Sequence, residues 1–199
     1  NNEVIPASGS VNFFLRLYNV KHAFTIPKNI ILTVMPVSAA WDEGGGLDME
    51  EYSDLDTVNW ISSSNGTAWA KYGGDFHTGA YVAGTTLPFY SASFESGTED
   101  LELNITALVE EWMSAGSINS AGAHGRQNYG IGVFLTASQE AYFSSSLAPP
   151  VDNTTTFELH NVAGSTDSYY TKKFFARGTE FFYRRPVIEA RWDSSRKDD

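Results

Sequence analysis

The sequence predicts an all-β fold, namely a jelly-roll-like β-sandwich with one short helix and long loop excursions. Two observations support this prediction. Apolar and polar residues alternate with a period of two in most of the regular segments, whereas helical spacing occurs in one segment alone. We expect a single domain over residues 1–199, because a chain of this length can bury a core of its own.

Seven segments have the alternation that is typical of half-buried strands. They are 11–18, 30–35, 101–105, 129–135, 156–162, 171–176 and 187–192. In the fourth segment, Gly130 and Gly132 occupy the face opposite the apolar side chains. We expect another part of the chain to approach closely there, where a side chain would obstruct packing.

The expected helix follows the strand at 101–105. Thr106 can cap its N-terminus, and Gly116 offers a C-terminal stop. One face of this helix is apolar, with Leu108, Val109, Trp112 and Met113. A helix of about ten residues is too short to be stable alone, so we expect it to cover an end of the core.

Two long stretches have neither the alternation of a strand nor the spacing of a helix. The first is the loop 42–99, and the second is 137–150. The wider segment of about 137–170 has the character of an insertion. Loops this long inside a compact domain are usually functional or part of an interface. We expect Trp41 and Trp60 to fill the core and Trp69, which has small residues on both sides, to lie at an interface.

Composition excludes several classes of protein. The chain has no cysteine, so it contains neither disulfides nor thiolate chemistry. Its net charge of −11 argues against nucleic acid as a partner. No segment reaches the roughly 18 apolar residues of a membrane span. The N-terminus lacks both Met and a signal pattern, and we expect a processed end or a piece of a longer chain.

Motifs for catalysis are also missing. The four histidines are scattered without a zinc-binding spacing, and no G-x-S-x-G nucleophile motif is present. The acidic run from Asp42 to Asp56 could supply oxygen ligands for calcium, but it lacks the D-x-D-x-D-G spacing of a dedicated loop. We therefore predict a non-enzymatic protein without a cofactor or a metal.

Basic residues gather at the C-terminus. Residues 168–199 hold eight of the thirteen lysines and arginines, in an otherwise acidic chain. We predict that this segment directs assembly and that the protein forms a homo-oligomer. The interface candidates are Trp69 together with four cations that could face an acidic neighbour, such as residues 42–56 of an adjacent copy. These cations are Lys172, Lys173, Arg184 and Arg185.

The C-terminal pattern TKKFFARG-x-E-x-F-x-x-RP-x-IEARWD, at 171–193, resembles structural proteins of tailed bacteriophages. The order of features along the chain also resembles the DNRLRE-type β-sandwich module. The matching segments are 15–18 (LRLY), 41–43 (WDE), 103–112 (LNITALVEEW), 128–133 (NYGIGV), 175–180 and 186–192.

This resemblance implies a structural component of a virion, in the head decoration, the neck or collar, or a tail fibre, whose partners are other virion proteins. The strands that open this module are absent here, so we expect either an upstream portion or a strand supplied by another subunit. The alternative function is a carbohydrate-binding module that attaches to host or cell-surface glycans through the aromatic residues of the long loop.

Overall fold

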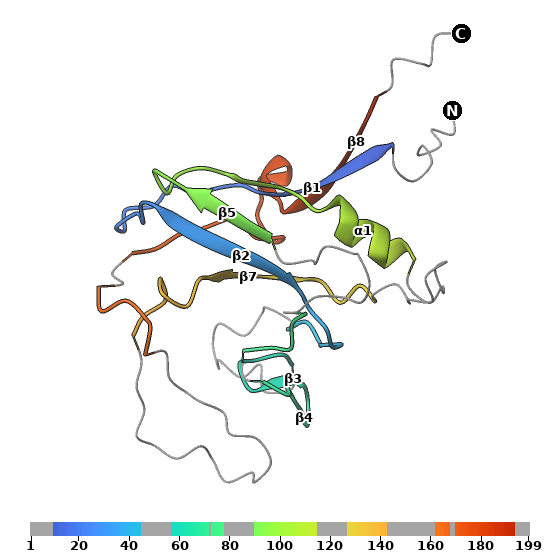
Figure 1. Cartoon of the computed structure of the whole chain (residues 1–199), viewed down its shortest axis with the longest axis horizontal. Coiled ribbons are helices and arrows are strands. Elements are labelled where there is room, and N and C mark those ends of the chain that lie inside the picture. Colours follow the sequence, from blue (N-terminus) through green and yellow to red (C-terminus); the bar gives the residue numbers. More distant parts are fainter. Residues whose placement is uncertain are drawn as a thin grey trace. The chain divides into compact units, whose positions relative to one another are not determined.

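The computed structural model describes residues 10–44, 57–71, 73–77, 90–114, 127–142, 162–167 and 170–193 (Figure 1). The chain divides into two compact units, each of which is described by itself. The first unit combines Asn1–Thr33, Tyr90–Arg126 and Ser168–Asp199, and the second combines Val34–Phe89 and Gln127–Asp167. The single domain over 1–199 stays a prediction.

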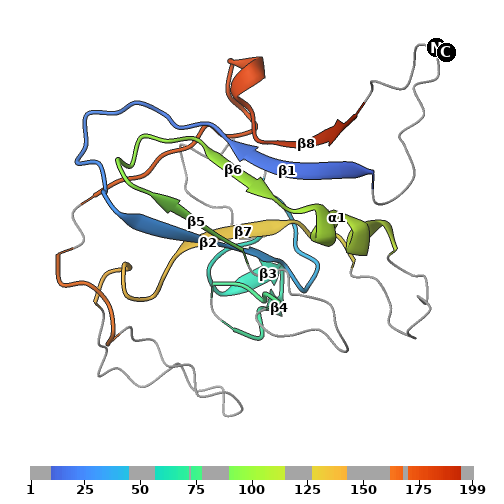
Figure 2. The same ribbon diagram turned by 45° about the horizontal axis from the view of Figure 1, so that its top comes forward.

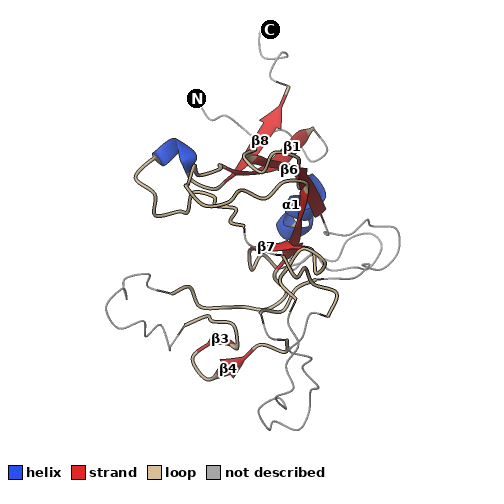
Figure 3. Ribbon diagram, turned by 90° about the vertical axis from the view of Figure 1, so that its left-hand side faces the viewer, coloured by secondary structure: helices blue, strands red, loops and turns tan. Residues whose placement is uncertain are grey.

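The all-β fold class is confirmed, because strands and one short α-helix make up the regular structure of the described residues (Figure 3). The jelly-roll arrangement of the strands stays a prediction. The strands are β1 (Val11–Leu17), β2 (Ile30–Pro36), β3 (Ser62–Ser64), β4 (Thr67–Ala68), β5 (Tyr90–Phe94), β6 (Leu101–Asn104), β7 (Ile131–Leu135) and β8 (Val187–Trp192).

The first unit contains an antiparallel sheet in the order β6-β1-β8 (Figure 2). Leu15 of β1 lies opposite Leu103 of β6 on one side and Ile188 of β8 on the other. One face of this sheet is apolar, and from it Val11, Leu15 and Leu101 are buried. The three predicted segments 11–18, 101–105 and 187–192 are thus confirmed as neighbouring strands.

Helix α1 (Thr106–Met113) follows β6 as predicted, although its details differ. Thr106 is not the cap: it is the first helical residue, and its hydroxyl accepts a hydrogen bond from the Phe13 amide at 2.8 Å. Leu108 is buried, whereas Met113 is exposed, so the buried stripe is narrower than the apolar pattern. Gly116 lies outside the described residues.

Strand β2 passes from the first unit into the second. It begins in the first unit and ends in the second, and its neighbours in a three-stranded sheet are β5 and β7. Ile30, Leu32 and Val34 are buried as the alternation predicts, but Thr33 is buried as well. At Thr33 both faces of this strand are therefore covered, although Ile31 on the same face as Thr33 is exposed; a half-buried pattern does not anticipate the burial of Thr33.

Gly132 of β7 confirms the expected close approach. A Cβ atom at this position would lie 2.5 Å from the Phe134 ring and 2.6 Å from the Phe76 ring. Those two rings meet edge to face in the second unit, with centroids 4.6 Å apart. Gly130 serves another purpose, since its φ of 97° favours glycine.

The predicted strands 156–162 and 171–176 do not occur as strands among the described residues. Residues 156–161 lie outside the described residues. Residues 171–176 contain no regular strand, although Phe174 forms an isolated antiparallel bridge with Asn19. Strands β3, β4 and β5 arise within 42–99, where no strand is predicted. None of the described helices is long and apolar enough to cross a membrane.

Candidate functional site

The basic segment 170–175 lies along the chain that follows β1. The amides of Val20 and Phe175 donate to the carbonyls of Lys173 and Tyr18, at 2.9 and 3.0 Å. This segment does not pair with β8. Instead β8 pairs with β1 itself, and 170–175 pairs with the irregular continuation of β1.

Lys172 is half-buried and bound within its own unit, whereas the sequence predicts an outward-facing residue. Its ammonium donates to three oxygens: Asn19 Oδ1 at 2.8 Å, the Gly97 carbonyl at 2.9 Å and the Glu99 carbonyl at 2.7 Å. Three acceptors satisfy all three donors of an ammonium group. Lys172 therefore ties the 97–99 turn to the segment after β1.

Two phenyl rings flank the same ammonium. Lys172 Nζ lies 4.7 Å from the centroid of Phe94 and 4.8 Å from that of Phe174. Burial lowers the pKa of Lys172, while the charges of Glu99 and Asp100 oppose this shift. Phe94 is almost fully buried, so the cation helps to close this end of the core.

The turn at 176–185 carries three exposed aromatic residues of the first unit. It is shaped by the 3-10 helix η1 (Phe182–Arg184) and by Arg185, whose guanidinium donates twice to the Thr179 carbonyl, at 3.2 Å. The side chains of Phe181, Phe182 and Tyr183 are all exposed, and Tyr183 is 87 % exposed. Large apolar side chains displayed together in this way are typical of contact surfaces.

The three remaining predicted cations lie on the surface beside aromatic rings. Lys173 lies 4.6 Å from the centroid of the exposed Phe24 ring, and Arg184 lies 5.6 Å from that of Tyr18. Arg185 lies 5.3 Å from the Phe182 ring centroid. We call Phe181, Phe182, Tyr183, Arg184 and Arg185 the aromatic–basic turn. Each of its five residues is exposed.

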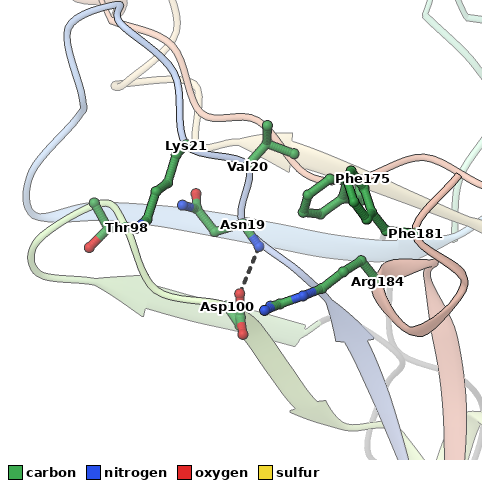
Figure 4. A pocket seen from close by; sticks show the side chains of 8 residues that line it. All are labelled: Asn19, Val20, Lys21, Thr98, Asp100, Phe175, Phe181 and Arg184. Atoms are coloured by element: carbon green, nitrogen blue, oxygen red, sulfur yellow. Dashed lines mark hydrogen bonds between the residues drawn. The ribbon is translucent and has the colours of Figure 1, made fainter. Parts of the chain in front are cut away.

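A pocket of about 630 Å³ lies beside the aromatic–basic turn (Figure 4). Phe175 and Phe181 form one wall, with an edge-to-face contact of 5.8 Å between their centroids. Asp100 accepts a hydrogen bond from the Asn19 amide at 2.7 Å, and Arg184 points toward Asp100 from the side of the turn. The pocket thus combines an apolar wall with charged groups of both signs.

Opposite charges also form a network on the polar face of the β6-β1-β8 sheet. Arg191 donates to both carboxylate oxygens of Glu102, at 2.9 and 3.0 Å, and to Glu189 at 3.0 Å. Arg16 donates to Glu189 at 3.0 Å. The hydrogen bonds from Arg191 and then Arg16 lower the pKa of Glu189 to about 2. This network joins three strands that are distant in sequence.

The tryptophans of the second unit reverse the predicted roles. Trp69, expected at an interface, is only 6 % exposed, and its indole N–H donates to the Asn59 carbonyl at 2.9 Å. Trp60, expected in the core, is 66 % exposed, and Trp41 is exposed as well. The β3-β4 hairpin and its neighbouring turns enclose Trp69, which removes it from the candidate contact surface.

The described residues hold no group of three His, Asp or Glu side chains that could bind a metal ion. Most of the acidic run, residues 45–56, lies outside them, as do His124 and His160. The functional residues that the sequence analysis missed are Phe181, Phe182 and Tyr183. Three consecutive aromatics before two arginines are a signal that could have identified them, because such a run cannot be buried entirely in a short turn.

Comparisons with known proteins do not assign this chain to a family. No family model matches the sequence. Neither a curated protein nor a solved structure matches it. The functional argument therefore depends on the residues themselves.

Proposed function

We propose that the protein is a non-enzymatic structural component of a tailed-phage virion, and that it acts through contacts with other virion proteins. The observation that carries this proposal is the aromatic–basic turn, whose five side chains are all exposed. Tyrosine, phenylalanine and arginine are the residues in which protein interfaces are enriched. The resemblance of 171–193 to structural proteins of tailed phages supports the same proposal.

The charge of the chain suggests the nature of the partner surface. Arg184 and Arg185 face solvent next to three exposed aromatics, while the chain as a whole has a net charge of −11. An acidic neighbour, either another virion protein or another copy, would match this turn. Trp69 and Lys172 have no part in the proposed surface, because both are engaged within their own unit.

Co-purification tests the proposal. The protein should be present at a fixed number of copies per particle in virions purified by density gradient, and it should stay attached through repeated banding at moderate salt. Its presence only in the unassembled fraction of the lysate would contradict a structural role. A defined stoichiometry in intact particles would support it.

Carbohydrate binding remains the second candidate, and the exposure of Trp60 favours it. One face of this indole is backed by Gly73: a Cβ atom at Gly73 would lie 2.8 Å from the ring. An exposed, supported ring is a suitable platform for the apolar face of a sugar. Binding to a glycan array that is lost in Trp60→Ala but kept in Trp41→Ala would favour this candidate over assembly.

A further inference from the structure

Strand β8 lies at the edge of the β6-β1-β8 sheet. In the sheet order β6-β1-β8, it pairs with β1 on one side, and no described strand pairs with its other side (Figures 1 and 2). An open edge presents backbone N–H and C=O groups that can pair with another chain.

Phe13 fixes the direction of the backbone groups. Its carbonyl accepts a hydrogen bond from the Ile105 amide at 2.8 Å, and its amide donates to Thr106 Oγ1 at 2.8 Å. Both groups of Phe13 thus point toward β6 and α1, away from β8. Ala190, which lies opposite Phe13, therefore occupies a position without hydrogen bonds to β1.

The position of Ala190 shows which backbone N–H and C=O groups of β8 point to the open edge. In an antiparallel ladder the N–H and C=O of one residue point to the same side, and the side alternates along the strand. Ile188, Ala190 and Trp192 therefore direct their backbone groups to the open edge. Ile188 is 43 % exposed, although it lies opposite the buried Leu15.

The sequence of β8 is complementary to itself about Ala190. In an antiparallel pair centred on this residue, Ile188 lies opposite Trp192 of the second copy, and Glu189 lies opposite Arg191. The first pair would extend the apolar face of the sheet, and the second would extend the network of Arg16, Glu102, Glu189 and Arg191. Both faces of the sheet would therefore continue across the contact.

Charge also selects this register over its neighbours. A pair centred on Glu189 would place Glu189 opposite itself. A pair centred on Arg191 would place Arg191 opposite itself and Glu189 opposite Asp193. Like charges directly opposite each other destabilise a sheet, so of these three registers the one centred on Ala190 is favoured by charge.

We infer that β8 pairs antiparallel with β8 of a second copy about a two-fold axis at Ala190, which joins two β6-β1-β8 sheets into one. The contact is isologous, as in most homodimers. It is independent of the aromatic–basic turn and names a second copy as a further partner. It also offers a source for the strand that the sequence analysis expects from another subunit.

Two edge variants of the full chain test this pairing by sedimentation velocity over a range of concentrations. Ala190→Pro removes an N–H that points away from β1, and proline is tolerated on an edge strand whose N–H is not part of the ladder. Ile188→Lys places a charge where the apolar pair would form. We expect a concentration-dependent dimer for the natural sequence and a dissociation constant at least about 10-fold higher for each variant.

Val187→Lys is the matched control. Val187 is 42 % exposed, almost the same as Ile188, but its backbone groups point toward β1 and the inferred register places it opposite Asp193 of the second copy. This substitution should leave the dimer at least as strong.

Cross-linking decides the register even if the proline variant fails to fold. The chain has no cysteine, so Ala190→Cys introduces a single thiol close to the two-fold axis. Facing Cα atoms in a hydrogen-bonded antiparallel pair are about 5.5 Å apart, within disulfide range. In the Val187→Cys variant the two equivalent thiols of the dimer would lie on the order of 20 Å apart, given a rise of about 3.3 Å per residue. Mild oxidation should cross-link the Ala190→Cys variant and leave the Val187→Cys variant unlinked.

Three results would overturn the inference. They are a natural sequence that stays monomeric at all concentrations, a dimer that persists in Ile188→Lys, and equal cross-linking at positions 187 and 190. Any of them would leave the proposed virion function to the co-purification experiment, because that experiment measures attachment to the particle and not the pairing of β8.

Discussion

Lys172 and Lys173 are adjacent in sequence but have different surroundings. The ammonium of Lys172 has three oxygen acceptors and two phenyl rings, whereas Lys173 is exposed and contacts the Phe24 ring. The acceptors of Lys172 are 73 to 153 residues away in sequence. No local pattern can predict such a contact, so the sequence cannot distinguish the two lysines.

This difference predicts unequal effects on stability. Lys172→Met should lower the free energy of unfolding by about 1–3 kcal/mol, because it leaves buried carbonyls without their charged donor. Lys173→Met should change it by less than about 0.5 kcal/mol, as is usual for an exposed position. Urea denaturation of both variants measures the difference. Equal, small effects would show that the Lys172 contacts contribute little.

Glu189 predicts a dependence of stability on pH. Its pKa in the folded protein is about 2, below the ordinary value of 4.5, because Arg191 and Arg16 donate to its carboxylate. A lowered pKa stabilises the fold above the ordinary value, and the contribution disappears as the pH falls toward 2. The contribution is small because the pair is exposed to solvent.

Glu189→Gln should therefore be less stable than the natural sequence at pH 6, and the two should converge as the pH approaches 2. Glu140→Gln, at an exposed position of the second unit, is the control and should not show this convergence. Thermal unfolding followed by circular dichroism between pH 2 and 6 measures the difference. A constant gap between Glu189→Gln and the natural sequence would show that the network does not act through the charge of Glu189.

At the scale of the elements, two glycines predict different tolerance to a side chain. Both have a positive φ, 79° at Gly97 and 72° at Gly66. A Cβ atom at Gly97 would overlap the Pro27 carbonyl oxygen, whereas one at Gly66 would meet open space. Gly97 also presents its carbonyl to Lys172.

Both Gly97→Ala and Gly66→Ala introduce the strain of a left-handed residue, about 1–2 kcal/mol. Only Gly97→Ala also forces the Pro27 backbone to move, so it should lose at least about 2 kcal/mol more than Gly66→Ala. Denaturant unfolding of the two variants tests this expectation. A similar loss for both would mean that the 97–99 turn shifts easily to accept the side chain.

The strands that the sequence predicts are those with large apolar residues at alternate positions. β1, β2, β6, β7 and β8 meet this condition, and all five are present. β3 is a run of three serines, and β5 reads YSASF, so their alternation has little hydrophobic contrast. Segment 171–176 does alternate, but its partner is the irregular part of the chain after β1. Within the described residues the two form one isolated bridge.

A cluster of cations in an acidic chain predicts a contact surface. Lys173, Arg184 and Arg185 are exposed, and their role in a contact stays a prediction. The aromatic residues of the same turn were missed because hydrophobic side chains are assigned to the core by default. Trp69 is the opposite case, because it is expected at an interface and is buried. Small neighbours in sequence do not show which distant residues cover a side chain.

At the scale of the whole molecule, we propose that the chain assembles through the aromatic–basic turn. Arg184 and Arg185 contact the protein mainly at its surface, through Tyr18, Phe182 and the Thr179 carbonyl. Reversing their charge should therefore change the stability of the monomer by no more than about 1 kcal/mol. Any large effect on assembly would then originate in the contact itself.

The most direct measurement is the incorporation of Arg184→Glu/Arg185→Glu into particles, quantified per virion beside Lys28→Glu/Lys71→Glu. The control has the same change in net charge at two exposed lysines outside the turn. We expect at least about a 10-fold loss of incorporation for the arginine variant, a difference of about 1.4 kcal/mol, and none for the control. Equal incorporation of a folded arginine variant and the control would contradict the claim that this turn directs assembly.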